Sequence, residues 1–151
     1  MYKVILLFFL AVIFFQDIKY RAVYWFLFPL VFVACLLETK EPVSPERMWN
    51  LVFIIGMLAA LTVYVSIRQG KWTNIAKGFF SWGDILFLLA ISPLLPLYGF
   101  IFYFTAGTFL SLVIHLLVNA FHKQETIPYA GYMALVLSVV VLFQEKIESW
   151  V

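Results

Sequence analysis

Two aspartates, Asp17 and Asp84, are the residues in this sequence best suited to chemistry. Each lies beside a long apolar stretch, and an ionisable side chain at the centre of a membrane helix costs about 2.5–3.5 kcal/mol on insertion scales. Two carboxylates that lie close together do not both ionise, so one holds a proton while the other acts as a base. Such a pair could direct water onto a peptide carbonyl, each positioned group contributing about 10²–10⁴-fold in rate.

The composition indicates the setting in which these carboxylates work. Of 151 residues, 65% are apolar and 12% are charged, which is typical of a membrane protein. The length predicts a single domain over 1–151. The net charge of +2 gives no support for nucleic-acid binding, and the single cysteine, Cys35, excludes an intrachain disulfide or a cysteine-based zinc cluster. No metal-ligand spacing or phosphate-binding loop is present, so we expect no metal and no cofactor.

The hydropathy pattern predicts an all-α membrane protein, a polytopic bundle of about six transmembrane helices in contact with membrane lipid. The apolar stretches are 2–16, 22–37, 49–67, 85–98, 99–121 and 129–143. Several are shorter than the roughly 20 residues of a full span. Pro93 and Pro96 favour a break that separates the fourth helix from the fifth, with the chain turning at 96–99. A single long, kinked helix is the alternative.

The distribution of charge predicts the orientation of these helices. No small-residue cleavage site follows the first apolar stretch, so we interpret it as a membrane helix and not as a signal peptide. An outside N-terminus places six of the ten lysines and arginines on the cytoplasmic side. Asp17 then ends the first helix and Asp84 begins the fourth at the same, cytoplasmic face. The loop before the last helix returns to that face as well.

A simpler interpretation of the two aspartates needs no catalysis. Asp84 could be an N-cap or a first-turn acid that the helix dipole favours. Asp17 could pair with Lys19 or Arg21 at the membrane boundary. Composition and topology do not choose between the two interpretations.

Three motifs in order resemble those of the prepilin peptidases. The stretch DIKYRAV (17–23) resembles their first aspartate motif, in which basic residues follow the aspartate. SWGD (81–84) is similar to their second motif, Gly-x-Gly-Asp, which the wider group of intramembrane aspartyl proteases shares. IPYAGYMAL (127–135) resembles the Ile-Pro-Phe-Gly-Pro-Phe segment that opens the last helix of the family.

The chain departs from the family pattern at several positions. Ser81 replaces the first glycine of the second motif, and Leu86 stands where the family usually has lysine. Tyr and Trp at 24–25 replace a common Pro-Asn pair, and Gly131 stands at a usual proline. Serine is small enough for close approach, so we expect the site to survive these changes.

The resemblance implies a membrane-embedded aspartyl endopeptidase in which Asp17 and Asp84 are the catalytic pair and water is the nucleophile. It implies that the protein removes the basic leader of pilin-like precursors, which continue into an apolar helix, near the cytoplasmic face of a bacterial or archaeal cytoplasmic membrane. With one cysteine and no room for a zinc-binding domain, the chain looks like a peptidase-only form. The residues expected to bind substrate or shape the site are Gly83, Ser81, Trp82, Lys19, Arg21 and Pro128.

The alternative function is a non-enzymatic, proton-coupled membrane protein or assembly subunit, in which the aspartates carry protons or hold helices together; an inactive relative of the peptidases is a further alternative. Gly107 and Ser111, four residues apart, predict a close helix crossing. His115 and Asn119 have the same spacing and could contact the aspartates, although packing between helices also explains them. The basic and aromatic segment 70–78 is interpreted as an interfacial linker, with a lid over the aspartates as the alternative.

Overall fold

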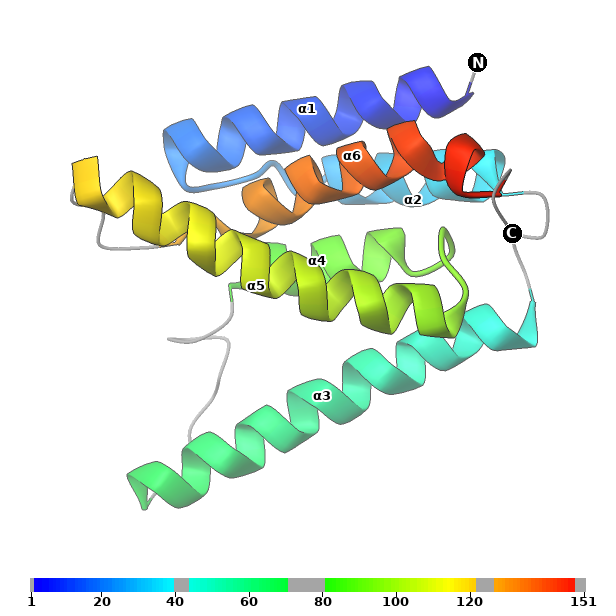
Figure 1. Ribbon diagram of the computed structural model, residues 1–151. Helices are drawn as coiled ribbons and strands as arrows, with labels where there is room; N and C mark the ends of the chain where they lie inside the picture. The colour runs from blue at the N-terminus through cyan, green and yellow to red at the C-terminus, as the bar shows by residue number, and fades with distance from the viewer. Residues whose placement is uncertain (1, 40–43, 71–80, 122–126, 149–151) are drawn as a thin grey trace.

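The structure is a computed structural model that describes residues 2–39, 44–70, 81–121 and 127–148 (Figure 1). These residues form six α-helices, which confirms the predicted all-helical fold and the predicted number of helices. In chain order the helices are α1 (Tyr2–Tyr20), α2 (Leu27–Glu38), α3 (Pro45–Gln69), α4 (Trp82–Ile91), α5 (Leu97–Phe121) and α6 (Tyr129–Glu148).

Helix α6 is the central element of the bundle. It lies beside α1 and also packs against α5 and α4 (Figure 1). Helix α2 packs between α1 and α4. Helix α3 is the outlying element: it contacts α4 and α5 and slants away from the other helices (Figure 1). The first and last helices of the chain are therefore neighbours in the fold (Figure 1).

The core between α1 and α6 is built from one face of each helix. Leu6, Leu10 and Ile13 recur at the spacing that puts side chains on a single helical face, and all three are fully buried. They belong to one apolar cluster with Met133 and Leu137 of α6. The next position on the same face of α1 is Asp17, so the packing of this helix turns the carboxylate inward.

The break between α4 and α5 occurs in the proline-containing segment, as predicted, but slightly earlier in the chain. Helix α4 ends at Ile91 and α5 begins at Leu97. The intervening residues 92–95 are buried, and the Asn50 side chain of α3 bonds to two of their carbonyls: its Nδ2 donates to the oxygens of Ser92, at 2.7 Å, and Leu95, at 2.8 Å. Asn50 is fully buried, so a polar side chain attaches the outlying helix to this turn.

A close crossing joins α5 to α6 at Gly107, as the small-residue spacing predicts. A Cβ atom at this position would lie 2.7 Å from Met133 Sδ, closer than real atoms approach. Beside it, the Tyr103 hydroxyl donates to the Met133 carbonyl at 2.7 Å. The two helices therefore come together where one of them has no side chain.

Two of the six helices, α3 and α5, are long and apolar enough to cross a membrane. Helices α2 and α4 have 12 and 10 residues, or about 18 and 15 Å at 1.5 Å per residue, against a hydrocarbon layer of about 30 Å. The predicted stretches 22–37 and 85–98 were longer because apolar composition continues through the turns that precede α2 and follow α4. Of the six predicted spans, two are thus matched by helices of membrane-spanning length and composition.

We expect Asn50→Leu to lower the free energy of unfolding by about 1–3 kcal/mol, because it leaves two buried carbonyls without donors. The measurement is denaturant unfolding of the purified protein in detergent, followed by circular dichroism.

Thr62→Val is the matched control on the same helix. The Thr62 hydroxyl donates only to the Leu58 carbonyl one turn earlier, at 2.7 Å, so its loss should change stability by less than about 0.5 kcal/mol. Equal effects of the two substitutions would contradict the role given to Asn50.

Candidate functional site

Asp17 reaches the interior from the last turn of α1. It continues the buried face formed by Leu6, Leu10 and Ile13, and 9% of its surface is exposed. The helix ends directly after it: the Arg21 amide donates to the Asp17 carbonyl at 3.0 Å, and Arg21 has a φ of 55°, in the left-handed region that non-glycine residues seldom adopt. The carboxylate is therefore fixed on a helix end and directed into the bundle.

Asp84 is positioned by the start of α4. Ser81 is the N-cap residue, and its hydroxyl accepts from the Asp84 amide at 3.2 Å. In return Asp84 Oδ2 accepts from the Ser81 amide at 2.9 Å, which completes a capping box. The serine that departs from the family pattern thus has a structural role here. The first-turn position considered in the simpler interpretation is the one that Asp84 occupies.

The first turn of α6 brings the two aspartates together. The Ala130 amide donates to Asp84 Oδ1 at 3.1 Å, and the Gly131 amide donates to Asp17 Oδ2 at 2.7 Å. The first amides of a helix have no partner within it, and the helix dipole makes this end favourable for negative charge. Two consecutive amides therefore hold two carboxylates from different helices side by side.

Gly131 allows α1 and α6 to approach this closely. A Cβ atom there would lie 3.1 Å from Asp17 Cβ, 3.2 Å from Asp17 Oδ2 and 3.4 Å from the Phe14 carbonyl oxygen. Pro128 is buried just before the turn, and its carbonyl accepts from the Tyr132 amide at 3.0 Å. The third motif thus supplies both the start of α6 and the gap into which Asp17 fits.

Tyr129 connects this turn to α5. Its hydroxyl lies 2.8 Å from the Thr108 hydroxyl in a hydrogen bond. Its side chain is half-buried and is close enough to Asp84 for a charge interaction. Helix α5 therefore also contacts the turn that binds both carboxylates.

The other predicted site residues lie at varying distances from the pair. Trp82 is 67% exposed at the start of α4, and Lys19 is exposed, with its Nζ 5.1 Å from the centre of the Tyr20 ring. Arg21 is half-buried and acts on Asp17 through its charge. At Gly83 an added Cβ would meet only ordinary contacts, the nearest being Ser81 Oγ at 3.5 Å, so the described residues do not require glycine there.

Reasoning from the sequence did not identify Ala130 and Tyr129, which contribute a backbone amide and a hydroxyl. The signal that could have found them is Pro128, because a proline that opens a helix implies free amides in the turn that follows. His115 is buried, but the hydrogen bonds described for the two aspartates come from backbone amides. The predicted linker or lid in segment 70–78 falls almost wholly outside the described residues.

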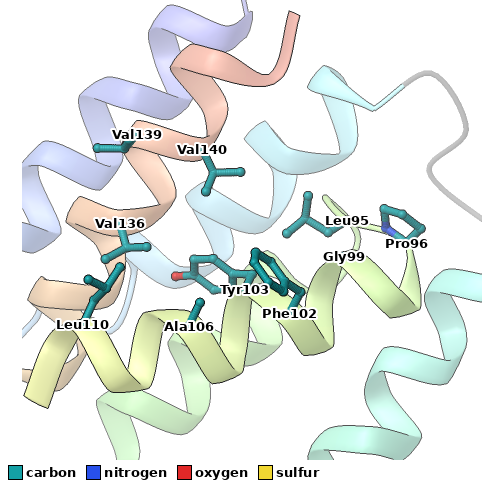
Figure 2. A pocket seen from close by; sticks show the side chains of 10 residues that line it. All are labelled: Leu95, Pro96, Gly99, Phe102, Tyr103, Ala106, Leu110, Val136, Val139 and Val140. Atoms are coloured by element: carbon teal, nitrogen blue, oxygen red, sulfur yellow. The ribbon is translucent and has the colours of Figure 1, made fainter. Parts of the chain in front are cut away.

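No group of three or more metal-ligating side chains occurs in the part of the chain that the structure describes. An apolar hollow of about 750 Å³ lies between α5 and α6 (Figure 2). Valines 136, 139 and 140 line it from α6, and Tyr103 turns its hydroxyl toward the backbone of that helix (Figure 2). Neither aspartate lines this hollow, so the candidate site is the pair of carboxylates and not the apolar cavity.

Comparison of the chain with protein-family models, with curated proteins and with solved structures finds no match. The resemblance to prepilin peptidases therefore depends on the three motifs.

We expect Gly131→Val to lower the free energy of unfolding by about 1–3 kcal/mol, because its side chain must displace Asp17 or separate α6 from α1. Thermal unfolding in detergent measures this. Gly56→Val is the control, since nothing lies within 4 Å of a Cβ atom at Gly56, and it should stay within about 0.5 kcal/mol of the parent protein. A Gly131→Val protein as stable as this control would contradict the close approach.

Proposed function

We propose that this protein is a membrane-embedded aspartyl endopeptidase of the prepilin peptidase type. In this proposal the chain is a single six-helix domain in a bacterial or archaeal cytoplasmic membrane, with its N-terminus outside. Asp17 and Asp84 activate water and cleave pilin-like precursors between a basic leader and an apolar helix, near the cytoplasmic face. The substrate class comes from the motif resemblance.

The observation that supports this proposal most strongly is the meeting of the two aspartates at α6. The two residues lie far apart in the sequence, each is 9% exposed, and adjacent amides bind them. A carboxylate in a site with little water is stabilised by a proton, a hydrogen-bond donor or a counter-charge. Two neighbouring carboxylates favour a state in which one is protonated and the other is ionised. This is the arrangement that acid–base attack of water on a peptide bond requires.

The surface of the bundle supports the membrane setting. Large apolar side chains are exposed on several helices, including Ile67 at 76%, Tyr98 at 87% and Phe102 at 75%. An apolar surface of this kind is unfavourable in water and favourable in lipid. Together with the length of α3 and α5, it favours a bundle surrounded by lipid, with the short helices accommodated by local thinning of the bilayer.

We expect Asp17→Asn and Asp84→Asn each to reduce cleavage of a co-expressed pilin-like precursor by at least about 100-fold, because an amide neither takes nor gives the proton that the reaction moves. Cleavage is measured by the shift of the precursor on gels and by mass spectrometry of the new N-terminus.

Glu46→Gln is the matched control, since it removes an acid from the first turn of α3, which contributes nothing to the site. It should cleave like the parent protein. Membrane insertion of all variants is checked by fractionation. Continued cleavage by either aspartate variant would refute the peptidase assignment.

A second candidate function is a proton-coupled protein or an assembly subunit. The capping box favours it, because that structure accounts for Asp84 without any reaction. The bonds to Ala130 and Gly131 likewise hold α6 to α4 and α1 whatever the chemistry. In this case the parent protein cuts no precursor, and the aspartate variants change proton flux or complex formation instead.

A further inference from the structure

We infer that, of the two aspartates, Asp17 carries the proton in the resting protein and Asp84 is ionised. The ionisation states follow from hydrogen-bond geometry and do not need the proposed function. The catalytic roles that they imply rest on it: Asp84 would be the base toward water, and Asp17 the acid toward the substrate carbonyl.

Asp84 has both carboxylate oxygens engaged as acceptors of backbone N–H groups. Oδ1 accepts from Ala130 at 3.1 Å and Oδ2 accepts from Ser81 at 2.9 Å. Backbone donors on both oxygens favour the charged form of a carboxylate. A proton on either oxygen would weaken that oxygen as an acceptor or turn its O–H toward another donor. The arrangement around Asp84 therefore suits a carboxylate and not a carboxylic acid.

Asp17 has one oxygen engaged by a backbone amide in the described part of the chain. Oδ2 accepts from the Gly131 amide at 2.7 Å, so Asp17 has one backbone donor where Asp84 has two. A carboxylic acid fits this arrangement without conflict, since its carbonyl oxygen accepts from Gly131 while its O–H points elsewhere. When one of two neighbouring carboxylates must be protonated, Asp17 is the one whose contacts allow it.

The charged and titratable groups near the two aspartates do not reverse the assignment of the proton to Asp17. Arg21 and Tyr132 are close enough to Asp17 for charge interactions, and Tyr129 is close enough to Asp84. The guanidinium of Arg21 favours an ionised Asp17, whereas the negative charge of an ionised Asp84 opposes it. The tyrosines are neutral at pH 7 and do not reverse the order.

In the proposed reaction the proton assignment fixes the direction of each transfer. Asp84 takes a proton from water as the water oxygen bonds to the carbonyl carbon, and Asp17 gives its proton to the carbonyl oxygen, which forms a gem-diol. As the C–N bond breaks, Asp84 returns its proton to the leaving nitrogen, and a gem-diol hydroxyl gives its proton to Asp17. The products are an acid and an amine, and both aspartates recover their starting states.

Solid-state NMR of the unaltered protein in lipid vesicles at pH 7 tests the assignment directly. Asp17 and Asp84 are the only aspartates in the chain, so aspartate labelled with ¹³C at the side-chain carboxyl yields two signals of interest. Serine labelled with ¹⁵N identifies Asp84, because the Ser81 nitrogen lies 2.9 Å from its Oδ2. Dipolar coupling to this nitrogen reduces the Asp84 signal selectively.

We expect the signal coupled to serine nitrogen at the shift of an ionised carboxylate and the uncoupled signal at that of a carboxylic acid. The reverse order would overturn the assignment, as would two ionised or two protonated groups. Because the measurement uses no substrate, its outcome is independent of the cleavage assay. A protein that cleaves precursors and shows the reverse order would retain the proposed function and refute only this inference.

The melting temperatures of the two asparagine variants, compared in one detergent, give a second test. Asparagine resembles a protonated aspartate, so Asp17→Asn should melt within about 2 °C of the parent protein. In Asp84→Asn the new NH₂ group must face the N–H of Ser81 or Ala130, so the melting temperature should fall by at least about 2–4 °C. A larger loss in Asp17→Asn than in Asp84→Asn would contradict the inference.

Discussion

The structure depends on one pair of hydrogen bonds, in which consecutive amides at the start of α6 bind carboxylates from α1 and α4. These bonds satisfy two helix-end donors that have no partner within their own helix. They also stabilise two acids in an interior that offers little water. The amides gain acceptors and the carboxylates gain donors from the same two bonds. The three helices therefore meet at a point that apolar packing alone would not define. The apolar cluster between α1 and α6 supplies the contact area, and the polar contact adds a directional hydrogen bond between the two helices.

Much of the fold could be predicted from the sequence, because hydrophobic stretches and prolines report directly on helices and their breaks. The helix ends were less predictable: residues 22–26 are all apolar in type, like most of the helix that follows, yet the chain turns there. Apolar composition does not distinguish a turn from a helix. The length of α4 was overestimated because its apolar run continues past Ile91 into the proline-containing turn. These helix lengths bear on the predicted membrane spans, since α2 and α4 are too short to cross a bilayer of ordinary thickness by themselves.

The pairing of the aspartates was predictable, but the means by which it is achieved was not. Charge asymmetry placed Asp17 and Asp84 at one face of the bundle, and the structure brings them to one helical turn. A sequence does not show which backbone amides bind a side chain, so Ala130 could not be distinguished from any other alanine. Ser81 departs from the family pattern, but in the structure it caps α4 and holds the carboxylate of Asp84, three residues further on. A substitution can thus preserve a site by a different local contact.

The capping box of α4 has a thermodynamic consequence for the site. Because the Asp84 carboxylate binds the amide of Ser81 with one oxygen and that of Ala130 with the other, fraying of the first turn of α4 and detachment of α6 are linked equilibria. Opening either contact removes part of the support for the other, so the two helix ends open as one cooperative unit. The formation of the site therefore depends on the local folding of both helix ends and not on any single side chain.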